Sequence, residues 1–336
     1  MYPELLEIPF IHVTIKSYGV TMVIGFLAAV ALMRRLSRSI PFDREFITNT
    51  AIWALVAGVV GSRLFFIVHH SKSFRGRPLE IFSIWEGGLE FLGGVILAVG
   101  VILFCVLYRK LSIRRCLDVF AVGLMLGLAF GRIGCFLNAD CFGRPTDLPW
   151  GVRFPYKSFV YISQINADPA RNRAEPHLKL PQNEYLAYVA EDGTWYPKPL
   201  DELTQQQKVE VTEGKYRCLP GHPTQLYSSA CAVLMCVILY LFWRRSQNSP
   251  DRLFAKPGTT FALALVLYGI VRFLIEFLRD DNPLEHRRWI MHVIYNLYKG
   301  GTVSQNLCIY MIILGVVLIV AFQLGRSGQQ SFHLKS

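Results

Sequence analysis

Seven long apolar runs divide this 336-residue sequence and restrict the folds that it can adopt. Each run is long enough, or nearly so, to cross the hydrocarbon core of a bilayer, which takes about 20 helical residues. The runs are rich in Leu, Val, Ile and Phe with many Gly and Ala residues, a composition typical of closely packed membrane helices. A β-barrel would show shorter segments of alternating polarity. The runs lie at residues 17–33, 46–68, 90–108, 118–138, 224–243, 258–278 and 305–324.

The overall composition agrees with a membrane protein. Hydrophobic residues make up 52% of the chain and charged residues 18%, which is too apolar for an ordinary soluble protein of this length. The net charge of +11 does not require a nucleic-acid partner, because lysine and arginine also mark cytoplasmic loops and attract anionic lipid headgroups. We therefore expect an all-α polytopic membrane protein that binds no nucleic acid.

Lysine and arginine residues cluster after the first, third and fifth runs and in the C-terminal tail. Such clusters favour the cytoplasmic side, so the pattern predicts seven transmembrane helices with the N-terminus outside and the C-terminus inside. The opposite loops carry Arg75, Arg77, Arg287 and Arg288. The clustered residues are Arg34, Arg35, Arg38 and Arg44, then Arg109, Lys110, Arg114 and Arg115, then Arg244, Arg245, Arg252 and Lys256, and finally Arg326 and Lys335.

One long polar segment, residues 145–222, separates the fourth run from the fifth. It is rich in Pro, Tyr and charges of both signs, and its stretches LPWGVRFP and GTWYPKP are typical of short strands and turns. The topology predicts a small mixed extracytoplasmic head here, either a solvated cap or a guide for the substrate. The expected division is helices one to four in residues 1–144, the head in 145–222, and helices five to seven with the tail in 223–336.

Charged residues occur deep in three of the runs. Arg63 lies in the second run, Arg132 in the fourth, and Arg272 with Glu276 in the sixth. Each charge near the bilayer centre costs on the order of 2.5–3.5 kcal/mol, so these residues require partners. Arg272 and Glu276 are four residues apart and can form an ion pair on one helical face, which could be purely structural.

The arginines in these runs outnumber the single carboxylate. An anionic ligand would balance the excess, and a lipid phosphate fits because guanidinium groups bind phosphate oxygens in a bidentate manner. Arg63 and Arg132 could alternatively extend to the membrane interface. An anion transporter is a further alternative, but the internal repeats and broken helices of transporters are not evident.

Glycine and polar residues gather at the predicted outer ends of the runs. Residues 131–144, GRIGCFLNADCFGR, end the fourth run; residues 85–94, WEGGLEFLGG, begin the third; and residues 222–227, HPTQLY, begin the fifth. Glycines allow a ligand or another helix to approach the backbone closely. The pattern predicts a site at the outer face of the bundle.

The cysteines indicate neither a metal nor a cofactor. No CxxC pair and no ladder of His and Cys residues is present, so no metal site is expected. Cys141 and Cys218 both fall on the predicted outer side, where a disulfide between them is possible but is not determined by the sequence.

The stretch GRIGCFLNADCFGR resembles the signature of the prolipoprotein diacylglyceryl transferases, bacterial membrane enzymes that attach a diacylglyceryl group to the lipobox cysteine of lipoprotein precursors. The resemblance extends over nearly the whole chain. In order along the sequence it includes Tyr18-Gly19, GSRLFF at 61–66, WEGGLEF with Gly93-Gly94, the signature, HPTQLY, and YGIVRFLIEFLR at 268–279.

The resemblance implies a seven-helix protein of the bacterial inner membrane with its active site toward the periplasm. Phosphatidylglycerol would be the donor and the signal peptide of a prolipoprotein the acceptor, and thioether formation would release glycerol phosphate without a cofactor. By position, the resemblance assigns catalytic roles to Arg132, Arg272, Asp140 and Glu276, with the two arginines on the donor phosphate. It assigns substrate binding to Tyr18, Arg63, Gly93, Gly94, Asn138, Gly143, His222, Tyr268 and Arg279.

The sequence departs from the family pattern near the expected site. Many members have His immediately before the Gly-Gly of the third run, where this chain has Leu92. Histidine is the only side chain whose unperturbed pKa suits proton transfer near neutrality, so the proton acceptor becomes Asp140, Glu276 or the lipid phosphate. A catalytically altered lipid-binding paralogue is the alternative function. The other departures are Cys135 for Asn, Ala139-Asp140 for Gly-Glu, and Ser228 for Glu.

Overall fold

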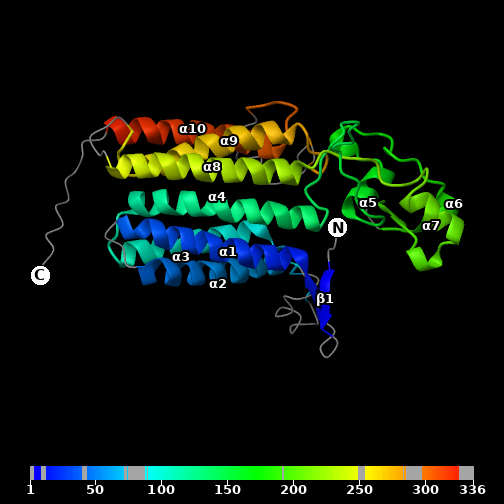
Figure 1. Cartoon of the computed structure of the whole chain (residues 1–336), viewed down its shortest axis with the longest axis horizontal. Coiled ribbons are helices and arrows are strands. Elements are labelled where there is room, and N and C mark those ends of the chain that lie inside the picture. Colours follow the sequence, from blue (N-terminus) through cyan, green and yellow to red (C-terminus); the bar gives the residue numbers. More distant parts are fainter. Residues whose placement is uncertain are drawn as a thin grey trace, which may run out of the picture.

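The computed structural model is a helical bundle with a compact head at one end (Figure 1). It describes residues 4–8, 13–39, 44–71, 74, 88, 90–190, 193–248, 254–282, 284 and 297–324. The long helices are α1 Ser17–Leu36, α2 Arg44–His69, α3 Phe91–Tyr108, α4 Ile113–Leu137, α8 Thr224–Asn248, α9 Thr259–Glu276 and α10 Val303–Leu324. An antiparallel hairpin of β1 Glu4–Ile8 and β2 Val13–Lys16 precedes α1, and the short 3₁₀ helix η1 Ser37–Ser39 follows it.

Six of these helices are long and apolar enough to cross a membrane, namely α1, α2, α4, α8, α9 and α10. The apolar helix α3 falls below that length over its residues Leu92–Tyr108. The prediction of a largely helical polytopic membrane protein is confirmed, whereas the count of seven spans and their orientation remain predictions.

Helix α4 lies at the centre of the bundle. It packs against α1 on one side and α8 on the other, while α9 pairs with α10 and α2 pairs with α3. The largest buried cluster joins α1, α4 and α8 through residues such as Met33, Val119 and Leu239. Because α4 also contacts α9, its last turn reaches a position where residues from several helices can meet.

The one carboxylate of α4 supports the fold. Asp118 is buried, and its two carboxylate oxygens accept hydrogen bonds from the backbone N–H groups of Gly258, at 2.7 Å, and Phe261, at 2.9 Å. These N–H groups belong to the N-terminus of α9, where backbone donors lack partners within the helix. Asp118 therefore joins α4 to α9 at the end of the bundle away from the head.

The head lies at the end of the bundle where α4 finishes and α8 begins (Figure 1). Its core contains Tyr161, Tyr185 and Val211, which are almost fully buried. The stretch GTWYPKP contains strand β4, as predicted, whereas LPWGVRFP forms only an isolated bridge between Val152 and Gly221. The elements are α5 Phe159–Ile165, η4 Pro169–Arg171, α6 Gln182–Tyr185, β3 Leu186–Val189, β4 Trp195–Pro197, η5 Leu200–Glu202 and α7 Gln205–Thr212.

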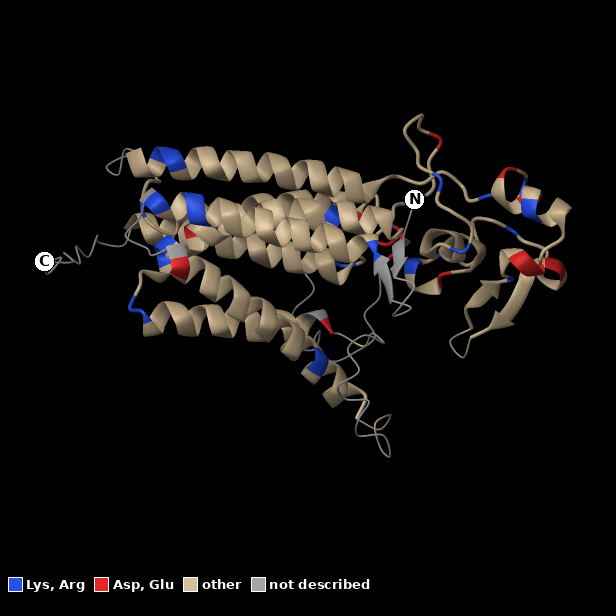
Figure 2. Ribbon diagram, turned by 60° about the horizontal axis from the view of Figure 1, so that its bottom comes forward, with Lys and Arg blue, Asp and Glu red and all other residues tan. Residues whose placement is uncertain are grey.

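The two ends of the bundle differ in charge. Figure 2 shows lysine and arginine gathered at the end away from the head. Several residues used to predict the orientation lie outside the described residues, as does the side chain of Arg44. They are Arg75, Arg77, Arg252, Arg287, Arg288, Arg326 and Lys335.

Candidate functional site

The loop after α4 turns sharply and fixes Asp140. Ala139 and Cys141 both adopt left-handed backbone conformations, with φ of 57° and 55°, which are uncommon for residues with a side chain. The amide of Asn138 donates to the Asp140 carboxylate at 2.9 Å, and the amide of Gln225 on α8 donates to the backbone carbonyl of Asp140 at 2.6 Å. The other carboxylate oxygen of Asp140, Oδ1, is buried and has no hydrogen-bond partner.

Gly143 lies where three segments cross. The N–H of Arg144 donates to the carbonyl of Leu278 at 2.9 Å, and the N–H of His222 donates to the carbonyl of Arg144 at 3.0 Å. A methyl group at Gly143 would lie 2.6 Å from the carbonyl oxygen of His222 and 2.8 Å from that of Leu278. The end of α4, the start of α8 and the end of α9 therefore meet, and only glycine fits between them.

Replacing Gly143 by alanine is expected to destabilise this crossing. The added methyl group must displace backbone atoms, and such overpacking costs roughly 1–3 kcal/mol. We expect a lower Tm in detergent for Gly143→Ala. The matched control is Gly127→Ala on α4, because the nearest atom to its new methyl group is 3.6 Å away. Equal Tm values for the two variants would contradict the assigned role of Gly143.

Arg132, Tyr268 and Arg272 line one small pocket of about 10 Å³ between α4, α8 and α9. Leu128, Ser228, Met235, Val271 and Ile275 complete its wall. The sequence placed the first three residues in one site from separate motifs, and the structure brings them together.

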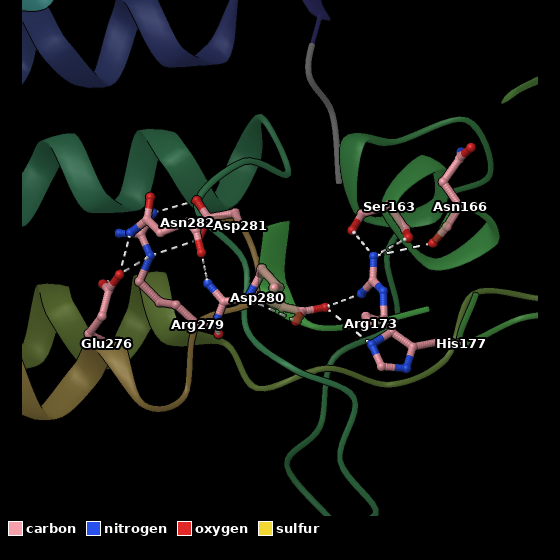
Figure 3. Close-up of polar contacts among 10 residues, drawn as sticks. Ser163, Asn166, Arg173, His177, Glu276, Arg279, Asp280, Asp281 and Asn282 are labelled. Atoms are coloured by element: carbon pink, nitrogen blue, oxygen red, sulfur yellow. Dashed lines mark hydrogen bonds and ion pairs between the residues drawn. The ribbon is translucent and has the colours of Figure 1, made fainter. Parts of the chain in front are cut away.

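The charges on α9 and just beyond it are paired with protein carboxylates, and Figure 3 shows this for Arg279, which lies between Glu276 and Asp281. Arg272 forms an ion pair with the buried Glu276 and donates to the hydroxyl of Ser304 on α10 at 3.2 Å. Arg279 lies 3.9 Å from Glu276 and binds Asp281 through two nitrogens, with its Nε donating at 2.8 Å. The predicted ion pair between Arg272 and Glu276 is confirmed.

Glu276 has both carboxylate oxygens engaged. Its Oε2 faces Arg272, and its Oε1 accepts a hydrogen bond from the amide of Asn282 at 2.7 Å. This arrangement orients Arg272 from the protein side of the pocket.

Arg132 differs from the other arginines of the site. It is half-buried, and within the described part of the chain it forms no hydrogen bond or ion pair with another residue. A half-buried guanidinium group without an anionic partner is unfavourable in an apolar bundle. The pocket shared with Arg272 thus contains one cation whose charge the described residues leave unmatched.

Tyr18 packs beside the signature segment, residues 131–144, at the end of α4. It lies on the first turn of α1, and a methyl group at Gly134 would be 3.0 Å from its ring. Its hydroxyl is within electrostatic range of Arg132 and Asp140. Tyr18 therefore lies close to the end of α4, and its assignment to the substrate remains a prediction.

Arg63, Gly93 and Gly94 lie in the contact between α2 and α3 and do not line the pocket of Arg132. Arg63 is buried, donates to the carbonyl of Gly88 at 3.2 Å, and lies over the ring of Phe66. A methyl group at Gly93 would lie 2.4 Å from the carbonyl oxygen of Gly61 on α2. These glycines allow two helices to touch, and their assignment to the substrate remains a prediction.

His222 lies at the junction of head and bundle, as expected. Its ring nitrogen Nδ1 is 3.5 Å from the Tyr227 hydroxyl, which also accepts a hydrogen bond from the Trp150 indole at 2.8 Å. Burial lowers the pKa of His222 below its ordinary value. Leu92, which replaces the family histidine, is 41% exposed on the first turn of α3.

A cluster around Asp280 fastens the head to the bundle, and sequence reasoning missed it (Figure 3). The carboxylate of Asp280 lies 2.6 Å from Arg173, 3.2 Å from His177 and 3.5 Å from Arg171. Arg171 also donates to the backbone carbonyl of Arg279 at 2.7 Å. The two arginines in residues 171–173 could have indicated a buried ion pair. Their partner Asp280, however, lies more than 100 residues away in the sequence.

Removing the Asp280 charge is expected to loosen the head. Asp280→Asn leaves Arg171 and Arg173 without their buried anion, and breaking such a cluster costs about 3–5 kcal/mol. We expect a lower Tm and faster proteolysis of the head at neutral pH. The control is Glu175→Gln, which removes an exposed ion pair with Lys179 and should change little.

The effect of Asp280→Asn on the Tm is also expected to depend on pH. Burial alone would raise the pKa of Asp280, but the hydrogen bond from His177 and the charge of Arg173 lower it below the ordinary value. A carboxylate with a depressed pKa stabilises the fold above its unfolded pKa of about 3.9 and loses that contribution as the pH falls. The Tm difference between wild type and Asp280→Asn should therefore narrow below about pH 4, and a constant difference would contradict the ionic role.

Two thiols lie next to each other in the signature loop. The Sγ atoms of Cys135 and Cys141 lie within 4.8 Å of each other, and the Cys135 thiol together with the nearby charges of Arg279 and Arg132 lowers the pKa of Cys141. Cys218 is a free thiol buried in the head, where it donates to Gln164 at 3.4 Å. Cys141 is also free, so the possible disulfide between Cys141 and Cys218 is not formed.

Comparison with known proteins gives one consistent result. A family model described as prolipoprotein diacylglyceryl transferase matches residues 3–321. Three proteins named phosphatidylglycerol--prolipoprotein diacylglyceryl transferase are similar to this chain. Those of Burkholderia cenocepacia (strain HI2424) and Cereibacter sphaeroides are 27% identical, covering 91% and 95% of this chain and 90% and 94% of their own. That of Synechococcus elongatus is 28% identical over 83% of this chain and 78% of its own.

Proposed function

Because the chain belongs to the prolipoprotein diacylglyceryl transferase family, it is a transferase of lipoprotein maturation, and we propose that it holds its lipid donor in the pocket between α4, α8 and α9. The reaction moves the diacylglyceryl group of phosphatidylglycerol to the lipobox cysteine of a prolipoprotein. Thioether formation releases glycerol phosphate.

The observation that carries the proposed site is the unmatched charge of Arg132. Arg132 lines the same pocket as Arg272, whose position is set by Glu276 and Ser304. A phosphate diester bound against both guanidinium groups, at the mouth of this small pocket, would supply the missing anion, and charge-assisted contacts of this kind are strong. Tyr268, also on α9, lines the same pocket.

The same arrangement serves the chemistry of transfer. The cysteine sulfur forms a bond to the glyceryl carbon, the bond from that carbon to the phosphate oxygen breaks, and negative charge develops on the leaving phosphate. Positioned guanidinium groups stabilise such a charge most strongly where water is excluded. They also favour the thiolate form of the incoming cysteine, whose ordinary pKa is about 8.5.

The contacts in the site favour Asp140 over Glu276 as the proton acceptor. Both oxygens of Glu276 are engaged, by Arg272 and Asn282, which makes Glu276 an orienting residue. Oδ1 of Asp140 is buried without a partner and can accept a proton. Asn138 holds the other oxygen at 2.9 Å and so fixes the direction of the carboxylate.

We further propose that all seven apolar helices span the bacterial plasma membrane, with the head outside and the C-terminus inside. The lysine and arginine gathered at the end of the bundle away from the head favour a cytoplasmic position for that end. The pocket, at the head end of α4, then opens toward the periplasmic side.

Incubation of the purified protein with labelled phosphatidylglycerol and a lipobox peptide tests the proposed function. We expect label on the cysteine peptide and none on a peptide with serine at that position. Lipid binding without a thioether product would instead support the altered, lipid-binding paralogue.

The same assay tests whether Leu92 matters. We expect the wild-type protein to turn over although Leu92 replaces the histidine, and Leu92→His to change the rate less than about tenfold, because general-base catalysis is worth roughly 100-fold or more when it is needed. An inactive wild type that is rescued by Leu92→His would show that a histidine base is required.

A further inference from the structure

The turn that follows α9, residues 279–282, lies between Glu276 and the head (Figure 3). On the bundle side the amide of Asn282 donates to Oε1 of Glu276 at 2.7 Å, while Oε2 of Glu276 faces Arg272. On the other side the carboxylate of Asp280 lies against the arginines of the head. One short turn therefore contacts both the head and the carboxylate that orients Arg272.

Arg171 of the head holds the backbone of this turn. Its guanidinium group donates to the carbonyl of Arg279 at 2.7 Å and also to the carbonyl of Asn282. Beside it, the N–H of Leu284 donates to the carbonyl of Ala170 at 2.7 Å. The side chain of Arg171 is only 3% exposed, so water cannot easily replace it as a donor. A buried carbonyl that loses its donor costs about 1–3 kcal/mol, and the turn is therefore expected to change shape without Arg171.

Arg171 does more than balance the charge of Asp280. Arg173 and His177 lie closer to that carboxylate, at 2.6 Å and 3.2 Å, than the Nε of Arg171 does at 3.5 Å. The two terminal nitrogens of Arg171 are used on backbone carbonyls instead. A planar guanidinium group can donate to two carbonyls in one fixed arrangement, whereas a lysine ammonium group is a single point of charge. The shape of the turn therefore depends on arginine at this position.

We propose that Arg171 is a positioning residue for transfer: it holds the turn in the shape that places Asn282 on Glu276, and Glu276 in turn directs Arg272 toward the donor phosphate. This inference rests on the proposed function, in which Arg272 binds that phosphate. A misplacement of about 1 Å at a reacting group can reduce a rate roughly 100-fold, so a residue that never contacts the lipid can affect transfer. The head then serves the donor site as well as the bundle that it is fastened to.

Steady-state kinetics of Arg171→Lys test the proposal. The variant keeps a positive charge beside Asp280 but cannot donate to both carbonyls of the turn. We expect the KM for phosphatidylglycerol to rise roughly tenfold and kcat to fall, with the KM for the lipobox peptide unchanged. The effect should stay below the factor of about 100 for a 1 Å shift, because Glu276 keeps its contacts with Arg272 and the side chain of Thr302. A merely structural role would lower kcat with the folded fraction and leave both KM values as in the wild type.

The matched control is Arg173→Lys, the same substitution in the same cluster. The guanidinium group of Arg173 donates to the carbonyls of Ser163 and Asn166, which belong to the head and not to the turn. This variant should therefore keep the wild-type KM for phosphatidylglycerol. An equal rise of that KM in Arg173→Lys would show that any loosening of the head has this effect, and would overturn the specific role of Arg171.

Asn282→Ala tests the second link without changing the head. It should raise the same KM by a similar factor. In the double variant with Arg171→Lys the two effects should not add, because both act through one contact on Glu276. Additive effects, or an unchanged KM in either single variant, would overturn the proposal.

The failure of the proposed function would look different. A wild type that gives no thioether product would count against that function and not against the role of Arg171. Binding of labelled phosphatidylglycerol, which needs no transfer, then decides that role by the same comparison: weaker binding in Arg171→Lys and Asn282→Ala, but not in Arg173→Lys, would support it, and equal binding in all of them would overturn it.

Discussion

Replacing Arg132 by alanine is expected to reduce transfer by roughly 100- to 1000-fold, the usual effect of removing one positioned donor from a developing anion. The structure supports so large an effect, because Arg132 lines the pocket and makes no polar contact with the described residues. Its removal therefore breaks no internal ion pair. The variant should insert and fold normally while it loses activity, measured as thioether product from labelled phosphatidylglycerol.

A matched control for Arg132 lies on the same helix. Arg115 is exposed near the N-terminus of α4, at the end of the bundle away from the head. Arg115→Ala should keep transfer within about twofold of wild type, since an exposed charge far from the pocket contributes little. If Arg132→Ala keeps full activity, Arg132 does not bind the donor phosphate and the proposed site is wrong.

Replacing Arg272 by alanine is expected to reduce transfer by a comparable factor and also to lower the Tm. The loss of activity follows from the lost phosphate contact. The loss of stability follows from Glu276, which is buried and would keep an uncompensated charge at a cost of about 3–5 kcal/mol. The two effects need separate measurement.

A double variant separates these two roles of Arg272. Arg272→Gln combined with Glu276→Gln removes both charges of the ion pair. Most of the loss in Tm should therefore be recovered, while transfer stays as low as in Arg272→Ala. Arg272→Lys keeps the charge but loses the planar, bidentate geometry, and its activity should be intermediate. Recovery of transfer in the double variant would show that Arg272 acts only through the ion pair.

The helices were predictable from the sequence because burial in a bilayer demands long apolar runs. The residues at which the helices begin and end were harder to predict. The first run was expected at 17–33, but α1 continues to Leu36, because arginine side chains at a helix end can extend to the interface. The last predicted residue of the sixth run was 278, whereas α9 ends at Glu276 and the following turn places Arg279 beside Asp281.

The site was predictable where one residue type fits one role. Arg132, Arg272 and Tyr268 were grouped by the need for an anionic ligand and by family resemblance, and they share a pocket. Gly93 was assigned to the substrate but lies against α2. A glycine in the sequence indicates that something approaches the backbone closely, but not whether it is a ligand or another helix. The Asp280 cluster was beyond prediction, since its partners meet only through the fold of the head.

The position of the donor phosphate tests the central claim most directly. An experimental structure with phosphatidylglycerol, or an analogue that is not turned over, should place the phosphate oxygens about 2.7–2.9 Å from guanidinium nitrogens of both Arg132 and Arg272. A phosphate bound elsewhere, with Arg132 neutralised by a carboxylate of the protein, would contradict the proposed site.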